Sequence, residues 1–210
     1  FNPLRAFRPR RIAAAVTEDV ALPFCRESFH FNKPFMDKEI FWSGLLEGKT
    51  IDLYYNKYPF TQAHGLLVPE RSKESPQQLT EEYHHYLCTL ASTLEQTLPG
   101  CGFGYNSYGA YASVNHLHFQ MFMREHPFPI QHSQWQHQGG EVSYPAHCYR
   151  TSHPPEAWQL IEQCHQNHTP YNLLYIGDSC YILPRVRQGS DTPQHWSSGF
   201  SWHEMAGGKL

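Results

Sequence analysis

Three polar side chains that could do chemistry recur at every second residue in one segment: His116, His118 and Gln120. Successive side chains of a β-strand point to opposite faces, so this spacing predicts that all three project from one face of a strand at 113–122. Neighbouring members would then lie roughly 6–7 Å apart. The residues between them are mostly apolar and suit a buried face: Asn115, Leu117, Phe119 and Met121. We interpret this strand as the reactive element of the chain.

Two histidines spaced in this way support three kinds of chemistry. A neutral imidazole is a good nucleophile toward a phosphoanhydride when its other nitrogen is held by a hydrogen bond, and Gln120 could stabilise a phosphoryl oxygen. Alternatively, His116 and His118 could bind one metal ion together with a third ligand such as His64. Both histidines could also be satisfied polar groups at the edge of a sheet. Spacing alone leaves these three interpretations open.

The elements before the reactive segment alternate between strands and a helix. Residues 50–55 and 63–69 have strand patterns. Apolar residues at three- and four-residue steps predict a helix that begins at Ser72 or Ser75, with Pro76 in a first-turn position, and ends near residue 98. A further strand is expected at 103–108. The order of two strands, a helix and two strands predicts an α+β fold with an antiparallel sheet and packed helices.

The second half of the chain has its own pattern. Residues 124–155 show no periodicity and are expected to form an irregular loop. A helix is predicted at 155–165 and a hairpin at 171–183, turning at Gly177-Asp178. A helix followed by a strand pair echoes the first half, so a degenerate internal duplication is one interpretation. The expected divisions are an N-terminal arm with the first strands (1–49), a catalytic core (50–123), the irregular loop (124–155) and a C-terminal helix and hairpin that complete the same domain (156–210).

The composition narrows the classes of function. A formal net charge of -3, with only a short basic run near the start, does not provide the basic surface that nucleic-acid binding needs. Six cysteines without a regular spacing do not suggest a disulfide framework or a zinc ribbon, and we expect free thiols. No apolar run is long enough to span a membrane, and no signal peptide opens the sequence. We therefore expect a cytoplasmic protein.

The reactive segment resembles a known active-site strand. Ser-Val-x-His-Leu-His-x-Gln at 113–120, preceded by Tyr105-Asn106-Ser107, is similar to that of the histidine-triad superfamily. The glutamine is typical of the His-x-His-x-Gln branch, which contains galactose-1-phosphate uridylyltransferase, diadenosine tetraphosphate phosphorylase and the GDP-hexose phosphorylases. Residues 56–59 and 64–69 resemble an upstream strand of this superfamily. The C-terminal pieces that look most like the GDP-hexose phosphorylases are 171–174, 183–185 and 202–208.

The resemblance implies a role for each matching residue. His118 would be the nucleophile that takes the nucleoside monophosphate, and His116 would orient it through its backbone carbonyl and its ring. Gln120 would hold a phosphate oxygen instead of acting as an acid. Asn56 would contact the ribose. The other substrate-binding residues that it implies are Lys57, Asn106, Ser113 and Asn115.

These roles imply a nucleotidyltransferase or phosphorylase that cleaves a nucleoside diphosphate hexose, such as a GDP-hexose, through a covalent nucleotidyl-histidine. A sugar 1-phosphate has a second pKa near 6 and needs little protonation as it leaves, which agrees with a glutamine in place of an acid. The expected partners are a nucleotide sugar or dinucleotide and a phosphate-type acceptor, with no nucleic acid, no membrane and a homodimer as one option. The zinc-binding cysteine pair of the uridylyltransferases is absent, so we expect neither a metal nor a cofactor.

Other functions remain open at this stage. They are a dinucleoside polyphosphate phosphorylase or hydrolase of the same superfamily, a metal-dependent enzyme with histidine ligands, and a nucleotide-binding protein without turnover. The residues that recognise the base have no motif. Phe41, Trp42 or Tyr54 could stack on a base, although aromatic residues more often pack in a core.

Overall fold

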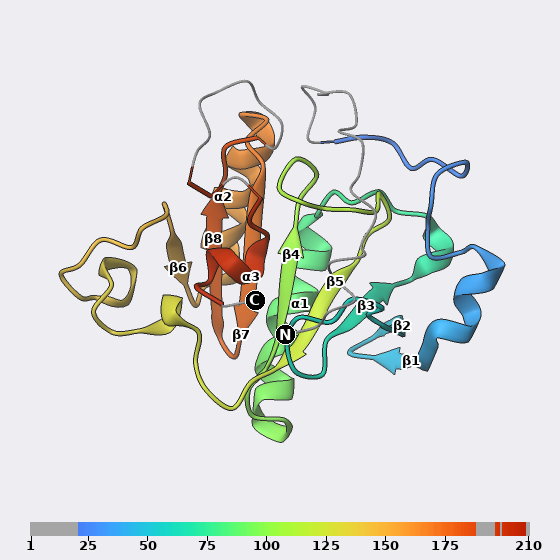
Figure 1. Cartoon of the computed structure of the whole chain (residues 1–210), viewed down its shortest axis with the longest axis horizontal. Coiled ribbons are helices and arrows are strands. Elements are labelled where there is room, and N and C mark those ends of the chain that lie inside the picture. Colours follow the sequence, from blue (N-terminus) through green and yellow to red (C-terminus); the bar gives the residue numbers. More distant parts are fainter. Residues whose placement is uncertain (1–20, 188–195, 198, 209–210) are drawn as a thin grey trace.

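The computed structural model describes residues 21–187, 196–197 and 199–208. Within them the chain forms one eight-stranded sheet with the order β1-β2-β3-β5-β4-β7-β8-β6, and every neighbouring pair is antiparallel. The strands are β1 (Ile40–Leu46), β2 (Lys49–Tyr55), β3 (Gly65–Pro69), β4 (Cys101–Asn106), β5 (Phe119–Met123), β6 (Tyr149–Thr151), β7 (Tyr171–Ile176) and β8 (Ser179–Pro184). The α+β class and the antiparallel sheet expected from the sequence are confirmed (Figure 1).

In the described residues, three α-helices accompany the sheet, together with short 3-10 turns. They are α1 (Glu81–Thr97), α2 (Pro154–Gln166) and α3 (Trp202–Met205), and the 3-10 turns are η2 (Pro34–Glu39), η3 (Arg71–Lys73), η4 (Pro129–Gln131) and η5 (Gln136–Gln138). The helix expected from Ser72 or Ser75 begins later, because the Thr80 hydroxyl caps it by accepting a hydrogen bond from the Tyr83 backbone N–H. The β1–β2 hairpin closes on Glu47 and Gly48, which both have positive φ, as a two-residue hairpin turn requires.

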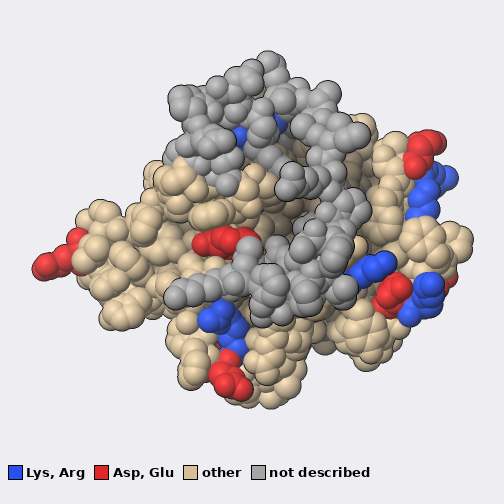
Figure 2. Space-filling view, in the orientation of Figure 1, with Lys and Arg blue, Asp and Glu red and all other residues tan. Residues whose placement is uncertain are grey.

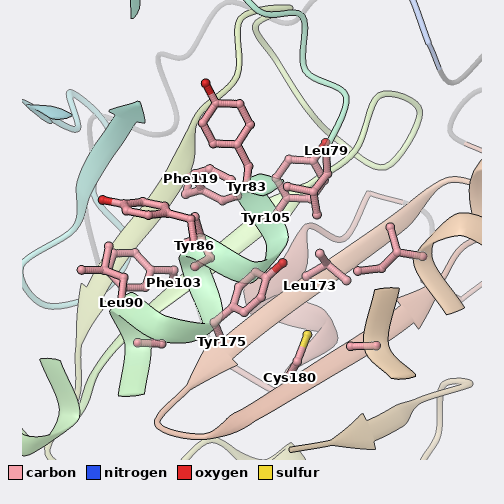
Figure 3. Close-up of a cluster of buried hydrophobic side chains, with 14 of the residues drawn as sticks. Leu79, Tyr83, Tyr86, Leu90, Phe103, Tyr105, Phe119, Leu173, Tyr175 and Cys180 are labelled. Atoms are coloured by element: carbon pink, nitrogen blue, oxygen red, sulfur yellow. The ribbon is translucent and has the colours of Figure 1, made fainter. Parts of the chain in front are cut away.

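The two faces of the sheet are covered by different segments. Helices α1 and α2 pack on one face, where the largest apolar core forms around Leu90, Phe103 and Tyr175 (Figure 3). The opposite face carries a second core, in which α3 packs through Trp202 against Phe122. The site described below lies where this second core meets β5.

The prediction of a strand at 113–122 is wrong for the first half of this segment. Strand β5 begins only at Phe119, because the backbone before it forms hydrogen bonds outside the sheet. The Leu117 N–H donates to the Ser75 carbonyl at 2.8 Å, and the His118 N–H donates to Gln77 Oε1 at 2.9 Å. Both histidines therefore lie on a bent segment that leads into the strand, and Gln120 lies within the strand.

Two other sequence-based expectations differ in detail. The segment expected to be irregular, 124–155, includes β6 at its end, because Tyr149–Thr151 pairs with β8. This edge strand has no signal in the sequence, since three residues are too few for a visible alternation. The division into four parts and the internal duplication stay predictions. No helix in the described part of the chain has both the length and the apolar character needed to cross a bilayer.

Candidate active site

A backbone carbonyl group holds one nitrogen of the His118 ring. Its Nδ1 lies 2.8 Å from the backbone oxygen of His116, and the His118 residue is only 6 % exposed. A carbonyl oxygen can only accept, so Nδ1 carries the proton, and Nε2 is the nitrogen with the lone pair in the neutral ring. The Gln77 amide fixes the backbone on both sides of this residue, because it accepts from the His118 N–H and donates to the His118 carbonyl at 3.1 Å.

The ring of His116 is held by two backbone groups. Its Nδ1 accepts from the Phe31 N–H at 3.2 Å, and its Nε2 donates to the Arg71 carbonyl at 3.1 Å. Burial lowers the pKa of His116 from 6.5 to about 4, with His118 nearby adding to the effect, so this imidazole is neutral near pH 7. A metal ion could bind His116 only if one of these bonds broke. No group of three or more potential His, Cys, Asp or Glu ligands forms among the described residues.

Aromatic rings from the N-terminal part of the chain cover the histidine pair. The Phe31 ring centroid lies 5.3 Å from that of His118 and 5.5 Å from that of His116, and Phe24 meets His116 edge-on at 5.1 Å. No pattern in the sequence indicates these contacts, since neither phenylalanine belongs to a periodic pattern. Desolvation by burial is the main physical reason why the His116 imidazole stays uncharged.

The carboxamide of Gln120 is bound at its oxygen. Oε1 lies 3.0 Å from the indole Nε1 of Trp202 and 3.1 Å from Nε2 of His64. The indole N–H can only donate, so the Gln120 atom that faces it is the oxygen. Within the described residues the Nε2 amide of Gln120 forms no hydrogen bond. The amide NH₂ group of Gln120, a hydrogen-bond donor, is therefore the part of the side chain that remains for a ligand.

Asn56 joins this group through His64. Its Nδ2 lies 2.9 Å from His64 Nε2, and its Oδ1 accepts from the Tyr58 N–H at 2.9 Å. The structure thus brings Asn56 near Gln120, as a shared site requires. Lys57 is exposed beside it. Its role in substrate binding stays a prediction.

The other expected substrate contacts are held by the protein itself. The buried Asn106 accepts at Oδ1 from Asn172 Nδ2 at 2.7 Å and from the Trp202 backbone N–H at 3.0 Å. Asn115 accepts from the Gln77 N–H at 2.9 Å and donates to the Pro23 carbonyl at 2.8 Å. These amides position the chain around the site. A direct substrate contact by either residue, or by the half-buried Ser113, stays a prediction.

A buried arginine links this group to the C-terminal segment. Arg185 donates to Asn172 Oδ1 and to the carbonyls of Ser197 and Phe200, the last two at 2.8 Å. Burial lowers its pKa to about 10. The bonds from Arg185 through Asn172 and Asn106 reach Trp202, so one polar network connects β8, β7 and β4 with α3. Only the family resemblance at 183–185 and 202–208 pointed to these residues.

Two surface features lie apart from this site. A pocket of about 500 Å³ is lined by Phe122, Arg124 and Phe128, among others, at the end of β5 away from His118. It contains none of the residues expected in the active site. On the face shown in Figure 2, the described Lys and Arg side chains lie beside acidic ones instead of forming a continuous basic surface.

An antiparallel α+β fold with the His-x-His-x-Gln motif beside its central strands agrees with the resemblance to the histidine-triad superfamily. The family model "GDPGP1-like, N-terminal domain" matches residues 2–122, more than half of the chain. The chain belongs to this family.

Named relatives and one solved structure are similar to parts of the chain. GDP-D-glucose phosphorylase 1 of Danio rerio is 36% identical over 112 residues, which are 52% of this chain and 32% of the relative. GDP-L-galactose phosphorylase 1 of Arabidopsis thaliana is 36% identical over 76 residues, which are 36% of this chain and 17% of the relative. The chain therefore spans less than a third of the length of these relatives. The crystal structure of yeast Ap4A phosphorylase Apa2 in complex with AMP aligns with a TM-score of 0.48 and 16% identity, covering 68% of this chain and 59% of that one.

Proposed function

We propose that this chain carries the reactive site of a phosphorylase that cleaves a nucleoside diphosphate hexose through a nucleotidyl-His118 intermediate. The observation that supports it most is the hydrogen bond from His118 Nδ1 to the His116 carbonyl. This bond directs the lone pair to Nε2 and compensates the positive charge that the ring acquires when Nε2 forms a bond. The names of the GDP-hexose phosphorylases among the relatives support the substrate class.

The reaction has two displacement steps at one phosphorus atom. In the first, His118 Nε2 attacks the α-phosphorus, and the bond from that phosphorus to the bridging oxygen breaks, so hexose 1-phosphate leaves with the electron pair. In the second, inorganic phosphate attacks the same phosphorus and releases the imidazole, which yields the nucleoside diphosphate. Gln120 donates its amide N–H to a phosphate oxygen in both steps. Because a sugar 1-phosphate is a weakly basic leaving group, a neutral donor suffices.

The neighbouring residues complete the proposal. Asn56 and Lys57 are proposed to contact the ribose and a phosphate, beside His64 and Gln120. Because the pKa of His116 is lowered to about 4, its ring is neutral near pH 7 and places no positive charge beside the nucleophile His118. The six cysteines are all free thiols, which supports a reducing cytoplasmic location. Homodimer formation stays a prediction, which is tested by the molecular mass that analytical ultracentrifugation measures in solution.

A trapping experiment tests the nucleophile. The chain is incubated with GDP-hexose labelled at the α-phosphorus, without phosphate, and denatured. We expect covalent label on the wild type and none on His118→Asn, whose amide can still donate to the His116 carbonyl. His84→Gln, a substitution of a buried histidine outside the site, is the matched control and should label like the wild type. Equal labelling of the wild type and His118→Asn would remove His118 as the nucleophile.

A second arm tests the substrate class. The same chain is incubated with unlabelled phosphate and either GDP-hexose or a dinucleoside tetraphosphate, and the products are separated. We expect GDP from the GDP-hexose, formed faster than any product of the dinucleotide. Faster cleavage of the dinucleotide would assign the chain to dinucleoside polyphosphates instead.

A further inference from the structure

We infer that Trp202 is a positioning residue, which fixes the Gln120 carboxamide with its N–H group toward the phosphate. This inference deepens the proposed function and rests on it. Trp202 lies 82 residues after Gln120 in the sequence, and its indole Nε1 is 3.0 Å from Gln120 Oε1. Three further observations support it.

A glycine makes the approach of the indole possible. Gly104 on β4 is paired with Gln120 on β5. A Cβ atom at position 104 would overlap the six-membered and five-membered rings of Trp202. The absence of that atom therefore lets the indole lie against β4 and reach the neighbouring strand.

The indole is itself held in one orientation. Trp202 has no exposed surface, and its ring stacks on Phe122 with centroids 5.0 Å apart and planes 22° apart. The Trp202 backbone N–H donates to Asn106 Oδ1 at 3.0 Å. Because both the ring and the backbone are fixed, the indole N–H points at one place.

The indole N–H then decides how the carboxamide turns. The two ends of a carboxamide have nearly the same shape, so steric contacts alone distinguish them weakly, and hydrogen-bonding partners must decide. The indole N–H of Trp202 can only donate, so the Gln120 atom that it meets must be the oxygen. The amide nitrogen is left to face the ligand. In the reversed orientation, the amide oxygen would face phosphate oxygens and repel them.

A double-mutant cycle separates positioning from general support of the fold. Trp202→Phe removes the indole N–H, and we expect kcat/KM for phosphorolysis of GDP-hexose to fall about fivefold to tenfold, the value of one neutral hydrogen bond. In a Gln120→Ala background, the same substitution should change kcat/KM by less than about twofold, because its effect passes through the missing amide. An equal loss in both backgrounds would show that Trp202 only supports the fold, and would overturn the inference.

Two further proteins control for packing. Benzothienylalanine at position 202 keeps the bicyclic ring and replaces the N–H by sulfur, so it should reproduce the loss seen with Trp202→Phe. Trp135→Phe removes an indole N–H that donates to the Pro129 carbonyl at 2.6 Å, outside the site, and should retain wild-type kcat/KM. Wild-type activity with benzothienylalanine at position 202 would overturn the inference.

A spectroscopic readout does not depend on activity. The side-chain NH₂ signals of Gln120 in ¹⁵N-glutamine-labelled protein are assigned by their loss in Gln120→Ala. We expect these signals to shift with benzothienylalanine at position 202 and to stay in place in Trp135→Phe. If the wild type lacks phosphorolysis but the signals shift, the proposed function fails and the positioning contact stands. Unshifted signals would overturn the positioning role itself.

Discussion

His116 should make the stability of this protein depend on pH. Its imidazole is 1 % exposed, and both ring nitrogens bond to backbone groups that require the neutral form. Its pKa is lowered from 6.5 to about 4, first by burial and then by the proximity of His118. The unfolded chain therefore binds a proton as the pH falls below about 6.5, while the folded chain does so only near pH 4. The stabilising contribution is present above pH 6.5 and is lost as the pH falls toward 4.

The size of the effect follows from this difference in pKa. Fully developed, it corresponds to about 3 kcal/mol in the free energy of unfolding. Between pH 7 and pH 5 the expected loss from this one residue is about 2 kcal/mol. His116→Gln should remove it, because a carboxamide can accept from the Phe31 N–H and donate to the Arg71 carbonyl without titrating.

Urea unfolding followed by far-UV circular dichroism measures this prediction. The free energy of unfolding is determined at pH 7 and pH 5 for the wild type, for His116→Gln and for His147→Gln, a substitution of an exposed histidine as the matched control. We expect the loss between the two pH values to be about 2 kcal/mol smaller in His116→Gln than in the other two proteins. An unchanged loss in His116→Gln would refute the reasoning that the buried ring stays neutral in the folded chain.

Three other predictions concern residues around the site and the core. His84→Gln should also reduce the loss of stability between pH 7 and pH 5 by about 2 kcal/mol in the same urea assay, because burial lowers the pKa of His84 to about 4; a full wild-type loss would contradict it. Gly104→Ala should lower the free energy of unfolding by about 1–3 kcal/mol, since its Cβ would overlap Trp202, and a thermal melt like that of the wild type would count against this packing. Asn106→Leu should cost about 1–3 kcal/mol by leaving two buried N–H donors without an acceptor, and Asn106→Asp, which keeps both acceptors, should lose less in urea unfolding. Equal losses for the two Asn106 variants would contradict the role assigned to its oxygen.

Local patterns in the sequence predicted the regular elements well. Strands β2 and β3, helix α2 and the β7–β8 hairpin lie close to their expected positions, because alternation, helical periodicity and turn residues act over a few neighbours. The prediction of a strand in the first half of the reactive segment was wrong because it also rested on a local pattern alone. Alternation in 113–118 does not show that Ser75 and Gln77 would take the backbone hydrogen bonds that a sheet partner would otherwise form.

The sequence by itself determined the reactive residue types, since His116, His118 and Gln120 stand in one short motif whose chemistry depends on type and spacing. Only the tertiary structure decided how each is held. The neutrality of His116 depends on its burial beside Phe31 and Arg71, and the direction of the Gln120 amide depends on Trp202. The proton on His118 depends on the bent backbone that brings the His116 carbonyl to its Nδ1. Hydrogen bonds and desolvation act over a few ångströms in space, whatever the separation along the chain. A local motif therefore names the reacting groups, and folding sets their protonation and orientation.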